Sequence, residues 1–261
     1  MVKQEALSRL GAEERQDRRH RRRSIRRKAA LRRFATLMIA AGVLSACSSA
    51  GDNAQSGGAG QTSTSVPTPT APFMSASGHN PPGRYAFTTS SDLDDSHRIT
   101  MDVPSGWGGS GDGHVISKGP GQGISTWVVR NVYADPCAWT GTLLDPPAGS
   151  SVDGLVAALA AQKARHASTP TPVTVYGFTG TYMELTTPAG INLADCDGGE
   201  FRSWVDWGGA RYTEPGQRDM LWILDVDGVP LVIDAALGEG TTRRDRVERT
   251  EIVESTQIEP L

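Results

Sequence analysis

Cysteine, aromatic residues and long apolar runs are all scarce in this sequence. The 261 residues include only 3 Cys, and Phe, Trp and Tyr together make up 6%. So few cysteines exclude the disulfide-dense scaffold of a small secreted domain. No apolar run reaches the about 20 residues that a membrane-spanning helix needs, which excludes a multi-span membrane protein. Three cysteines allow at most one disulfide within the chain.

Positive charge is scarce after the first 46 residues. Residues 1–46 contain 13 Lys and Arg against 4 Asp and Glu, whereas residues 47–261 contain 13 against 25, a net charge of −12. An acidic body excludes a cationic nucleic-acid-binding module, so no nucleic-acid partner is expected. The length that remains after the basic segment suits one domain of moderate size.

The basic segment has the layout of a signal peptide. The basic run Arg18–Arg33 is followed directly by the apolar stretch Phe34–Leu44, an order typical of export signals. The stretch ends in L-S-A-C, with small residues just before Cys47. This ending resembles a bacterial lipobox, of the kind found in actinobacterial lipoproteins. The resemblance implies cleavage between Ala46 and Cys47 and transfer of a diacylglyceryl group to the Cys47 thiol.

Two other interpretations fit this segment less well. The stretch from Phe34 to Ala46 covers 13 residues, which is too short to cross a membrane. An intracellular basic arm would bind phosphates, but the adjoining apolar stretch and lipobox argue against it. Arg32-Arg33-Phe34 resembles part of a twin-arginine signal, so the export route stays open.

We therefore divide the chain into three parts. Residues 1–46 are predicted to be a lipoprotein signal peptide, and residues 47–83, rich in Ser, Thr, Gly and Pro, a disordered linker. Residues 84–261 are predicted to form a single domain. Two acyl chains, such as palmitate, suffice for stable membrane anchoring. The expected location is the extracytoplasmic face of the cell membrane, with the lipid on Cys47 as the membrane contact.

With Cys47 assigned to lipid, Cys137 and Cys196 remain, an even number in an oxidising compartment. We predict that they form a disulfide. Neither cysteine has a second Cys or a His at ligand spacing, so no metal site is predicted. A catalytic thiol is the remaining alternative and would need a base such as His97, His114 or His166.

The domain alternates short β-rich segments with two amphipathic ones. A two-residue turn at Asp227-Gly228 predicts a hairpin in which Val226 faces Val229 and Met220 faces Ala235. On this register Asp225 and Asp234 lie opposite the main apolar stripe and are expected to be solvated. Further strands are predicted over residues 98–103, 123–133, 173–178, 181–187 and 202–207.

Two helices are predicted. The first covers residues 151–167 with Ser150 or Ser151 as its cap, and the second covers residues 242–255, where Thr242 and Asp245 form a capping box. The element order is not a regular βαβ alternation. It favours an α+β fold, in which the two helices pack on a mainly antiparallel sheet.

The domain also resembles a known family. Pro104-Ser-Gly-Trp107 after a strand, a middle helix, a β-meander and a final helix that ends in Ile252-Val-Glu-Ser255 are similar to the Mog1/PsbP-like α/β domain over residues 84–261. That family is mostly non-catalytic. The resemblance implies a ligand-binding or protein-binding domain, and it supplies no site residues.

Other patterns that could indicate chemistry have ordinary explanations. Residues 106–111 satisfy G-x-G-x-x-G, but no helix is predicted to follow, so they are interpreted as a loop and no cofactor is expected. Asp92–Asp95 and Asp225–Gly228 lack the later ligands of a calcium loop. The six Trp could form a carbohydrate-stacking surface, but Trp127 and Trp222 are expected in the core and at most one of Trp204 and Trp207 at the surface.

No catalytic residues are predicted, because the sequence has no G-x-S-x-G, S-x-x-K or H-E-x-x-H motif. We expect a membrane-anchored envelope lipoprotein whose extracytoplasmic domain binds a ligand or a protein without catalysis. The alternatives are an extracytoplasmic hydrolase whose site forms only in three dimensions, and an assembly role without a ligand.

Overall fold

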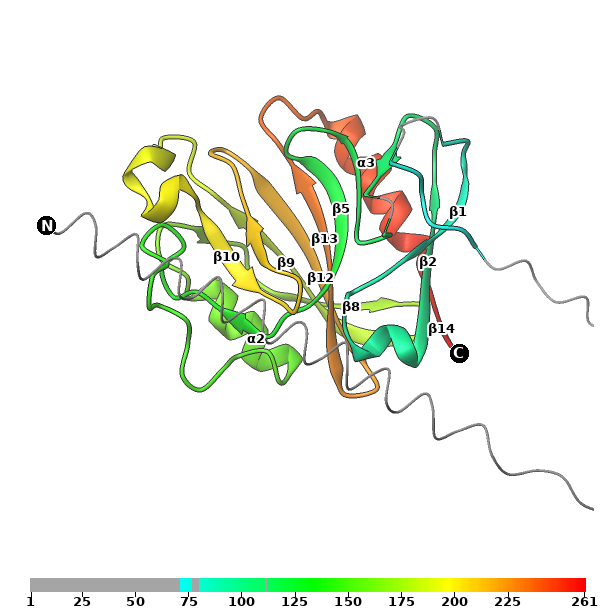
Figure 1. Ribbon diagram of the computed structural model, residues 1–261, viewed down its shortest axis with the longest axis horizontal. Coiled ribbons are helices and arrows are strands. Elements are labelled where there is room, and N and C mark those ends of the chain that lie inside the picture. The colour runs from blue at the N-terminus through cyan, green and yellow to red at the C-terminus, as the bar shows by residue number, and fades with distance from the viewer. Residues whose placement is uncertain (1–70, 77–79, 111) are drawn as a thin grey trace, which may run out of the picture. The chain divides into compact units, whose positions relative to one another are not determined.

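The computed structural model describes residues 71–76, 80–110 and 112–261 (Figure 1). The predicted signal peptide, which ends at Ala46, and the predicted lipidation site Cys47 lie outside the described residues. Among the helices of the described part, none is long and apolar enough to cross a membrane.

The domain is built on one large antiparallel sheet. Strand β8 (Thr171–Val175) lies off the main strand order and pairs with the first residues of β9 (Phe178–Thr186). The order across the sheet is β3 (Gly108–Gly109), β4 (Val115–Gly119), β5 (Gln122–Val128), β13 (Val229–Leu237), β12 (Arg218–Val226), β9 and β7 (His166–Ala167). The central strands are apolar on both faces, which is typical of strands covered on both sides.

Two smaller antiparallel sheets and two α-helices cover the large sheet. The helices are α2 (Val152–Ala160) and α3 (Arg243–Glu254), and short 3-10 helices occur at η1 (Asp92–Asp95), η2 (Leu193–Asp195) and η3 (Asp197–Gly199). The small sheets are β1 (Gly83–Phe87), β2 (His97–Val103) and β14 (Gln257–Pro260), and β11 (Ala210–Tyr212), β10 (Arg202–Val205) and β6 (Asn131–Val132). The structure thus confirms the α+β class.

The β12–β13 hairpin has the predicted register. Val226 pairs with Val229 and Met220 with Ala235. Asp227 and Gly228 both have positive φ, as a two-residue turn of this kind requires. The turn fixes the register, and the apolar residues of the two strands agree with it.

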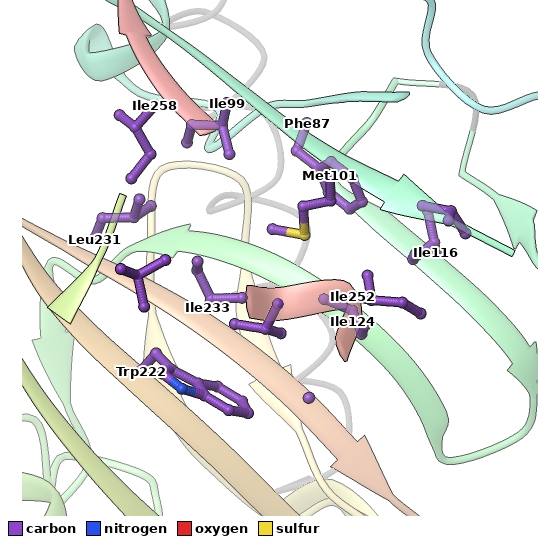
Figure 2. Packing of buried hydrophobic residues seen from close by; sticks show 14 of the residues in the cluster. Phe87, Ile99, Met101, Ile116, Ile124, Trp222, Leu231, Ile233, Ile252 and Ile258 are labelled. Carbon is purple, nitrogen blue, oxygen red and sulfur yellow. The ribbon is translucent and has the colours of Figure 1, made fainter. Parts of the chain in front are cut away.

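Each face of the large sheet has its own apolar core. On one face, Ile252 of α3 points toward Ile124 and Ile233, beside the sheet formed by β1, β2 and β14 (Figure 2). On the other face, Leu155 and Leu159 of α2 pack in a cluster that also contains Trp204 of β10. Figure 1 shows α2 and α3 on opposite sides of the central strands. The domain is therefore a three-layer arrangement around the β12–β13 hairpin.

Both predicted helix starts are correct, and one predicted helix end is wrong. The Ser151 side chain accepts the Gly154 amide at the start of α2, and Thr242 and Asp245 form the predicted capping box of α3. However, α2 ends at Ala160 rather than Ala167. Ala164 has a positive φ, and the Arg165 side chain that follows is buried and forms an ion pair with Asp219.

Two other boundaries differ from the prediction. The β-rich run at 123–133 is split at Val129-Arg130, and its last residues form β6 in a separate sheet. The ordered domain also begins before Arg84, since the Ala86 amide donates to the Pro72 carbonyl and Met74 is 1% exposed. Met74 is apolar and joins the core cluster beside β1, which the polar composition of the surrounding linker concealed.

Candidate functional site

A pocket of about 300 Å³ lies between the β4–β5 hairpin and β11, on the face of the large sheet that α2 also covers. It exists because two neighbouring positions are small: Ala235 pairs with Ile124, so the next residue, Ala236, lies beside Gly123. Trp127 and Tyr212 form its aromatic walls, and Arg211 forms its charged floor. We call this the β4–β11 pocket.

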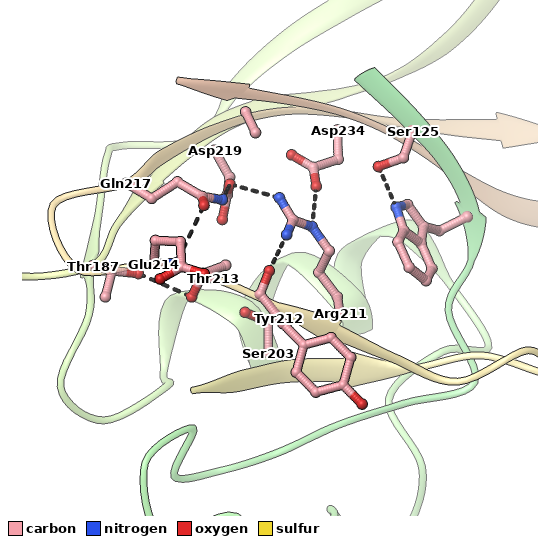
Figure 3. A network of polar contacts seen from close by, with 12 residues as sticks. Ser125, Thr187, Ser203, Arg211, Tyr212, Thr213, Glu214, Gln217, Asp219 and Asp234 are labelled. Carbon is pink, nitrogen blue, oxygen red and sulfur yellow. Dashed lines mark hydrogen bonds and ion pairs between the residues drawn. The ribbon is translucent and has the colours of Figure 1, made fainter. Parts of the chain in front are cut away.

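Arg211 is held by three acceptors. Its Nε donates to Asp234 Oδ2 at 2.5 Å, its Nη2 donates to Asp219 Oδ1 at 3.1 Å, and its Nη1 donates to the Tyr212 carbonyl. Figure 3 shows the guanidinium between the two carboxylates, with Ser125 on the neighbouring strand. Three bonds from one planar group fix its position, so the floor of the pocket is rigid.

A second arginine completes the buried network behind Arg211. Arg165 Nη2 donates to Asp219 Oδ2 at 2.5 Å, and its Nη1 donates to Ser203 Oγ at 2.5 Å. Gln217 Nε2 donates to Asp219 Oδ1, also at 2.5 Å. The Arg165 and Asp219 side chains are 1% and 0% exposed. Two arginines therefore match two carboxylates, and the network carries no net charge.

Burial shifts the pKa values of these groups. Burial raises the pKa of Asp234 to about 6, although the Arg211 charge opposes this. Burial also lowers the pKa of Arg165, against the charge of Asp219. The carboxylates Asp234 and Asp219 raise the pKa of Arg211 in spite of burial. Asp234 Oδ1 is buried and has no hydrogen-bond partner within the described part of the chain, so only one oxygen of this carboxylate is hydrogen-bonded there.

The expectation that Asp234 is solvated is wrong. Asp234 is 1% exposed, because Arg211 of β11 covers it and supplies its counter-charge. Asp225, which the sequence placed on the same face, is exposed and accepts the Gly228 amide within the turn. The two aspartates share a face of the hairpin, but only Asp234 lies beneath the smaller sheet of β6, β10 and β11.

The predicted disulfide is present. Cys137 and Cys196 are bonded, with their Cα atoms 4.5 Å apart. A catalytic thiol at either position is thereby excluded. The three histidines that could have served as its base have other surroundings. His97 pairs with Asp227, and His114 packs edge-on against Trp127. His166 is exposed in β7.

The tryptophans are mostly core residues. Trp127 and Trp222 are 7% and 5% exposed, as expected for the core. Trp204 is fully buried, whereas Trp207 is 64% exposed with Arg130 stacked over its ring at 3.9 Å. Trp139 donates to the Asp197 carbonyl at 2.6 Å, close to the disulfide. Trp127 is the only one of the six that lines the β4–β11 pocket in the described structure.

The acidic and glycine-rich motifs have structural roles. In the η1 segment Asp94 accepts hydrogen bonds from the amides of Thr89 and Ser91. The G-x-G-x-x-G segment contributes Gly108–Gly109 to β3 and the buried ring of Trp107, and the element that follows it is strand β4. Its last glycine, Gly111, lies outside the described residues. Across residues 71–76, 80–110 and 112–261 there is no group of three or more His, Cys, Asp or Glu that could hold a metal.

Sequence reasoning missed the four charged residues of the network. One signal was available: Asp219 and Asp234 stand in strands that are apolar on both faces, so neither face of those strands is solvated. A buried carboxylate requires a cation nearby. Arg211 could not be identified as that cation from the sequence, because it reaches Asp234 only when β11, paired with β10, lies over the large sheet.

Comparison with known proteins adds one distant structural match. No family model matches the chain, and a search of curated proteins gave no match. Among solved structures, the solution structure of cyanobacterial PsbP (CyanoP) from Synechocystis sp. PCC 6803 matches with a TM-score of 0.32 and 13% sequence identity. The match covers 69% of this chain and 94% of that chain. At this TM-score and identity the match carries no statement about the family or the function of this chain.

Proposed function

We propose that this chain is a lipid-anchored envelope protein whose extracytoplasmic domain binds a small ligand in the β4–β11 pocket. The observation that carries the proposal is the Arg211 guanidinium, which three acceptors hold in place at the floor of an open pocket. A rigid polar group among apolar walls is the usual composition of a small-molecule site.

The same network favours binding over catalysis. Asp219 and Asp234 are 0% and 1% exposed and both contact Arg211, so neither carboxylate reaches a molecule in the pocket. Ser125 Oγ accepts the Trp127 Nε1 hydrogen at 2.7 Å, and in the described part of the chain no histidine is bonded to it. A nucleophile needs a base within hydrogen-bond reach. The pocket therefore has groups that hold a ligand and lacks a nucleophile–base pair.

The anchor part of the proposal rests on the order of the sequence elements around Cys47. Radiolabelled palmitate supplied to cells that express the full chain is expected to label the wild type and not the Cys47→Ala variant. The variant is also expected to leave the membrane fraction, because one thiol carries both acyl chains. Equal labelling of the two proteins would contradict the anchor.

The pocket part is tested by thermal shift of the detergent-solubilised full chain against metals, saccharides, organic acids and amino acids. One class is expected to raise the melting temperature of the wild type, because a ligand that binds only the folded state stabilises it. The larger side chain in Ala236→Leu occupies the hollow beside Gly123, so this variant is expected to lose the shift.

Two further variants cover the case in which Ala236→Leu fails to fold. Tyr212→Ala removes an aromatic wall that is 46% exposed, and Tyr176→Ala removes a tyrosine of similar exposure, 48%, on the β8–β9 turn outside the pocket. Of these two tyrosine variants, Tyr212→Ala is expected to weaken the ligand-induced rise in melting temperature and Tyr176→Ala is not. If no class produces a shift, or if the shift is unchanged in Tyr212→Ala and Ala236→Leu, the pocket is not the binding site.

A further inference from the structure

The polar side chains Arg211 and Ser125 have hydrogen-bond donors left over in the β4–β11 pocket. Arg211 has five N–H groups, and three of them have acceptors in the described structure. Ser125 Oγ already accepts from Trp127 Nε1, which leaves its hydroxyl hydrogen to donate. Gln217 uses both ends of its amide, toward Asp219 and Glu214. A ligand that uses these donors presents oxygen acceptors to them.

The charge balance argues against an anionic ligand. Arg211 is the only charged residue among the described residues that line the pocket, and its charge is already matched by Asp219 and Asp234. A carboxylate or phosphate placed on the same guanidinium would meet no uncompensated positive charge, so the cost of removing it from water would not be repaid. The acceptors of the ligand are therefore neutral oxygens, such as hydroxyl, ether or amide groups.

The walls of the pocket fit a ring that has an apolar face. Trp127 and Tyr212 contribute aromatic surface, and Gly123 and Ala236 leave the space beside them open. A pyranose ring combines a face of C–H groups, which packs on aromatic rings, with a rim of hydroxyl oxygens. A volume of about 300 Å³ is at the small end of ligand sites and suits one such ring.

Aromatic surface continues outward from the rim of the pocket. The Arg202 guanidinium lies 5.4 Å from the Tyr212 ring centre and is stacked at 3.6 Å over the ring of Trp139. Glu200 binds the same guanidinium at 2.6 Å, so Arg202 is held in place between the two rings. A chain of sugars has a surface to follow beyond the first ring.

From these contacts we infer that the β4–β11 pocket binds one sugar unit of a neutral glycan, with the next unit against Tyr212, Arg202 and Trp139. The inference rests on the proposed ligand-binding function and specifies its ligand class. Arg211 and Ser125 donate to the sugar oxygens, Trp127 and Tyr212 pack on its C–H face, and the network behind Arg211 keeps the floor neutral.

Titration calorimetry on the detergent-solubilised full chain tests the inference. The probes are neutral trisaccharides of glucose, mannose and N-acetylglucosamine, together with a matched trisaccharide that ends in glucuronate, and citrate. At least one neutral trisaccharide is expected to bind, and its glucuronate counterpart is expected to bind more weakly because of the added negative charge.

The variants locate the site. Tyr212→Ala is expected to lower the affinity about tenfold through loss of the aromatic contact, whereas Tyr212→Phe keeps the ring and retains affinity. Tyr176→Ala should bind like the wild type.

If the neutral trisaccharides do not bind, the sugar inference is overturned. If citrate or the glucuronate probe binds instead and Tyr212→Ala weakens it, the pocket function stands and only the ligand class is wrong. Sugar binding that is unchanged in both Tyr212→Ala and Ala236→Leu overturns the pocket assignment as well.

Discussion

Asp234 in β13 and Arg211 in β11 form an ion pair of 2.5 Å that joins the large sheet to the small sheet of β6, β10 and β11. The Asp234 side chain is fully buried, and that of Arg211 is 14% exposed where it forms the pocket floor. Asp219 binds the same guanidinium and also that of Arg165. One contact thus connects two sheets and determines where the pocket places its donors.

Removing either partner of this pair is expected to destabilise the domain, and the arginine is the more costly loss. Arg211→Met leaves two buried carboxylates with Arg165 alone and should lower the free energy of unfolding by about 3–5 kcal/mol. Asp234→Asn removes a charge that burial already disfavours, so its cost should be nearer 1 kcal/mol. Urea denaturation at neutral pH measures both. Equal losses for the two variants would contradict this order.

The double variant Arg211→Met/Asp234→Asn is the control for coupling. Because the two side chains are in contact, the combined loss should be smaller than the sum of the separate losses. A strictly additive result would mean that the ion pair does not contribute to joining the sheets.

The raised pKa of Asp234 predicts a distinct pH dependence of stability. In the folded state this pKa is about 6, against an ordinary value of 3.8, so the folded state binds the proton more tightly. The stabilisation of the folded state that comes from protonated Asp234 is fully present below the ordinary pKa and is lost as the pH rises through about 6. Over that window the contribution is on the order of 3 kcal/mol.

Other carboxylates act in the opposite direction, so the wild type must be compared with Asp234→Asn. Arg246, together with Tyr182, lowers the pKa of Glu184 in spite of burial. The folded protein loses the stabilisation from such a carboxylate when acid protonates it. These contributions cancel in the difference between the two proteins. The wild type should gain stability relative to Asp234→Asn from about pH 7 to about pH 4. A difference that stays constant over this range would contradict the raised pKa.

The parts of the fold that the sequence predicted well depend on neighbours along the chain. Asp227 and Gly228 determine the turn, and the turn determines the pairing of every residue in the hairpin. Thr242 and Asp245 are three residues apart and define the start of α3 without help from the rest of the domain. Signals of this kind are complete within a few residues.

The pocket could not be predicted, because its parts come from distant strands. Gly123 and Ala236 lie side by side only after β5 pairs with β13, and Arg211 joins them only through β11. The same cause shortened α2: Arg165 has helix-forming neighbours, but its buried ion pair with Asp219 outweighs local propensity. Composition indicated that charged residues are solvated, and the buried network departs from this, as does the fully buried Arg249.

Gly228 is predicted to be required for the hairpin turn. It has a φ of +85°, and an added Cβ there meets nothing within 4 Å, so Gly228→Ala tests backbone conformation alone. We expect a loss of about 1 kcal/mol in the free energy of unfolding. Gly190→Ala is the matched control, since its Cβ also meets nothing within 4 Å and its φ is not in the left-handed region. Chemical denaturation should show a loss in the first variant only.

The Cys137–Cys196 disulfide is predicted to make a large contribution to stability. It joins residues 59 positions apart, and a loop of that length restricts the unfolded chain by about 4 kcal/mol in the loop-entropy model. The Cys137→Ala/Cys196→Ala variant should still fold, because hydrogen bonds join the same segments. The Asp197 amide donates to the Cys137 carbonyl at 2.8 Å, and Trp139 Nε1 donates to the Asp197 carbonyl.

Denaturation with and without reductant separates the disulfide from the effect of the substitutions. The wild type should lose stability in reductant and approach the double variant, while the double variant should not respond, since both cysteines of the disulfide are replaced. The cost arises in the unfolded chain, so the folded double variant should retain the near-ultraviolet circular dichroism of the wild type apart from the disulfide band. A wild-type midpoint that is unchanged once labelling confirms two free thiols would show that the hydrogen bonds around Asp197, and not the covalent link, hold these segments.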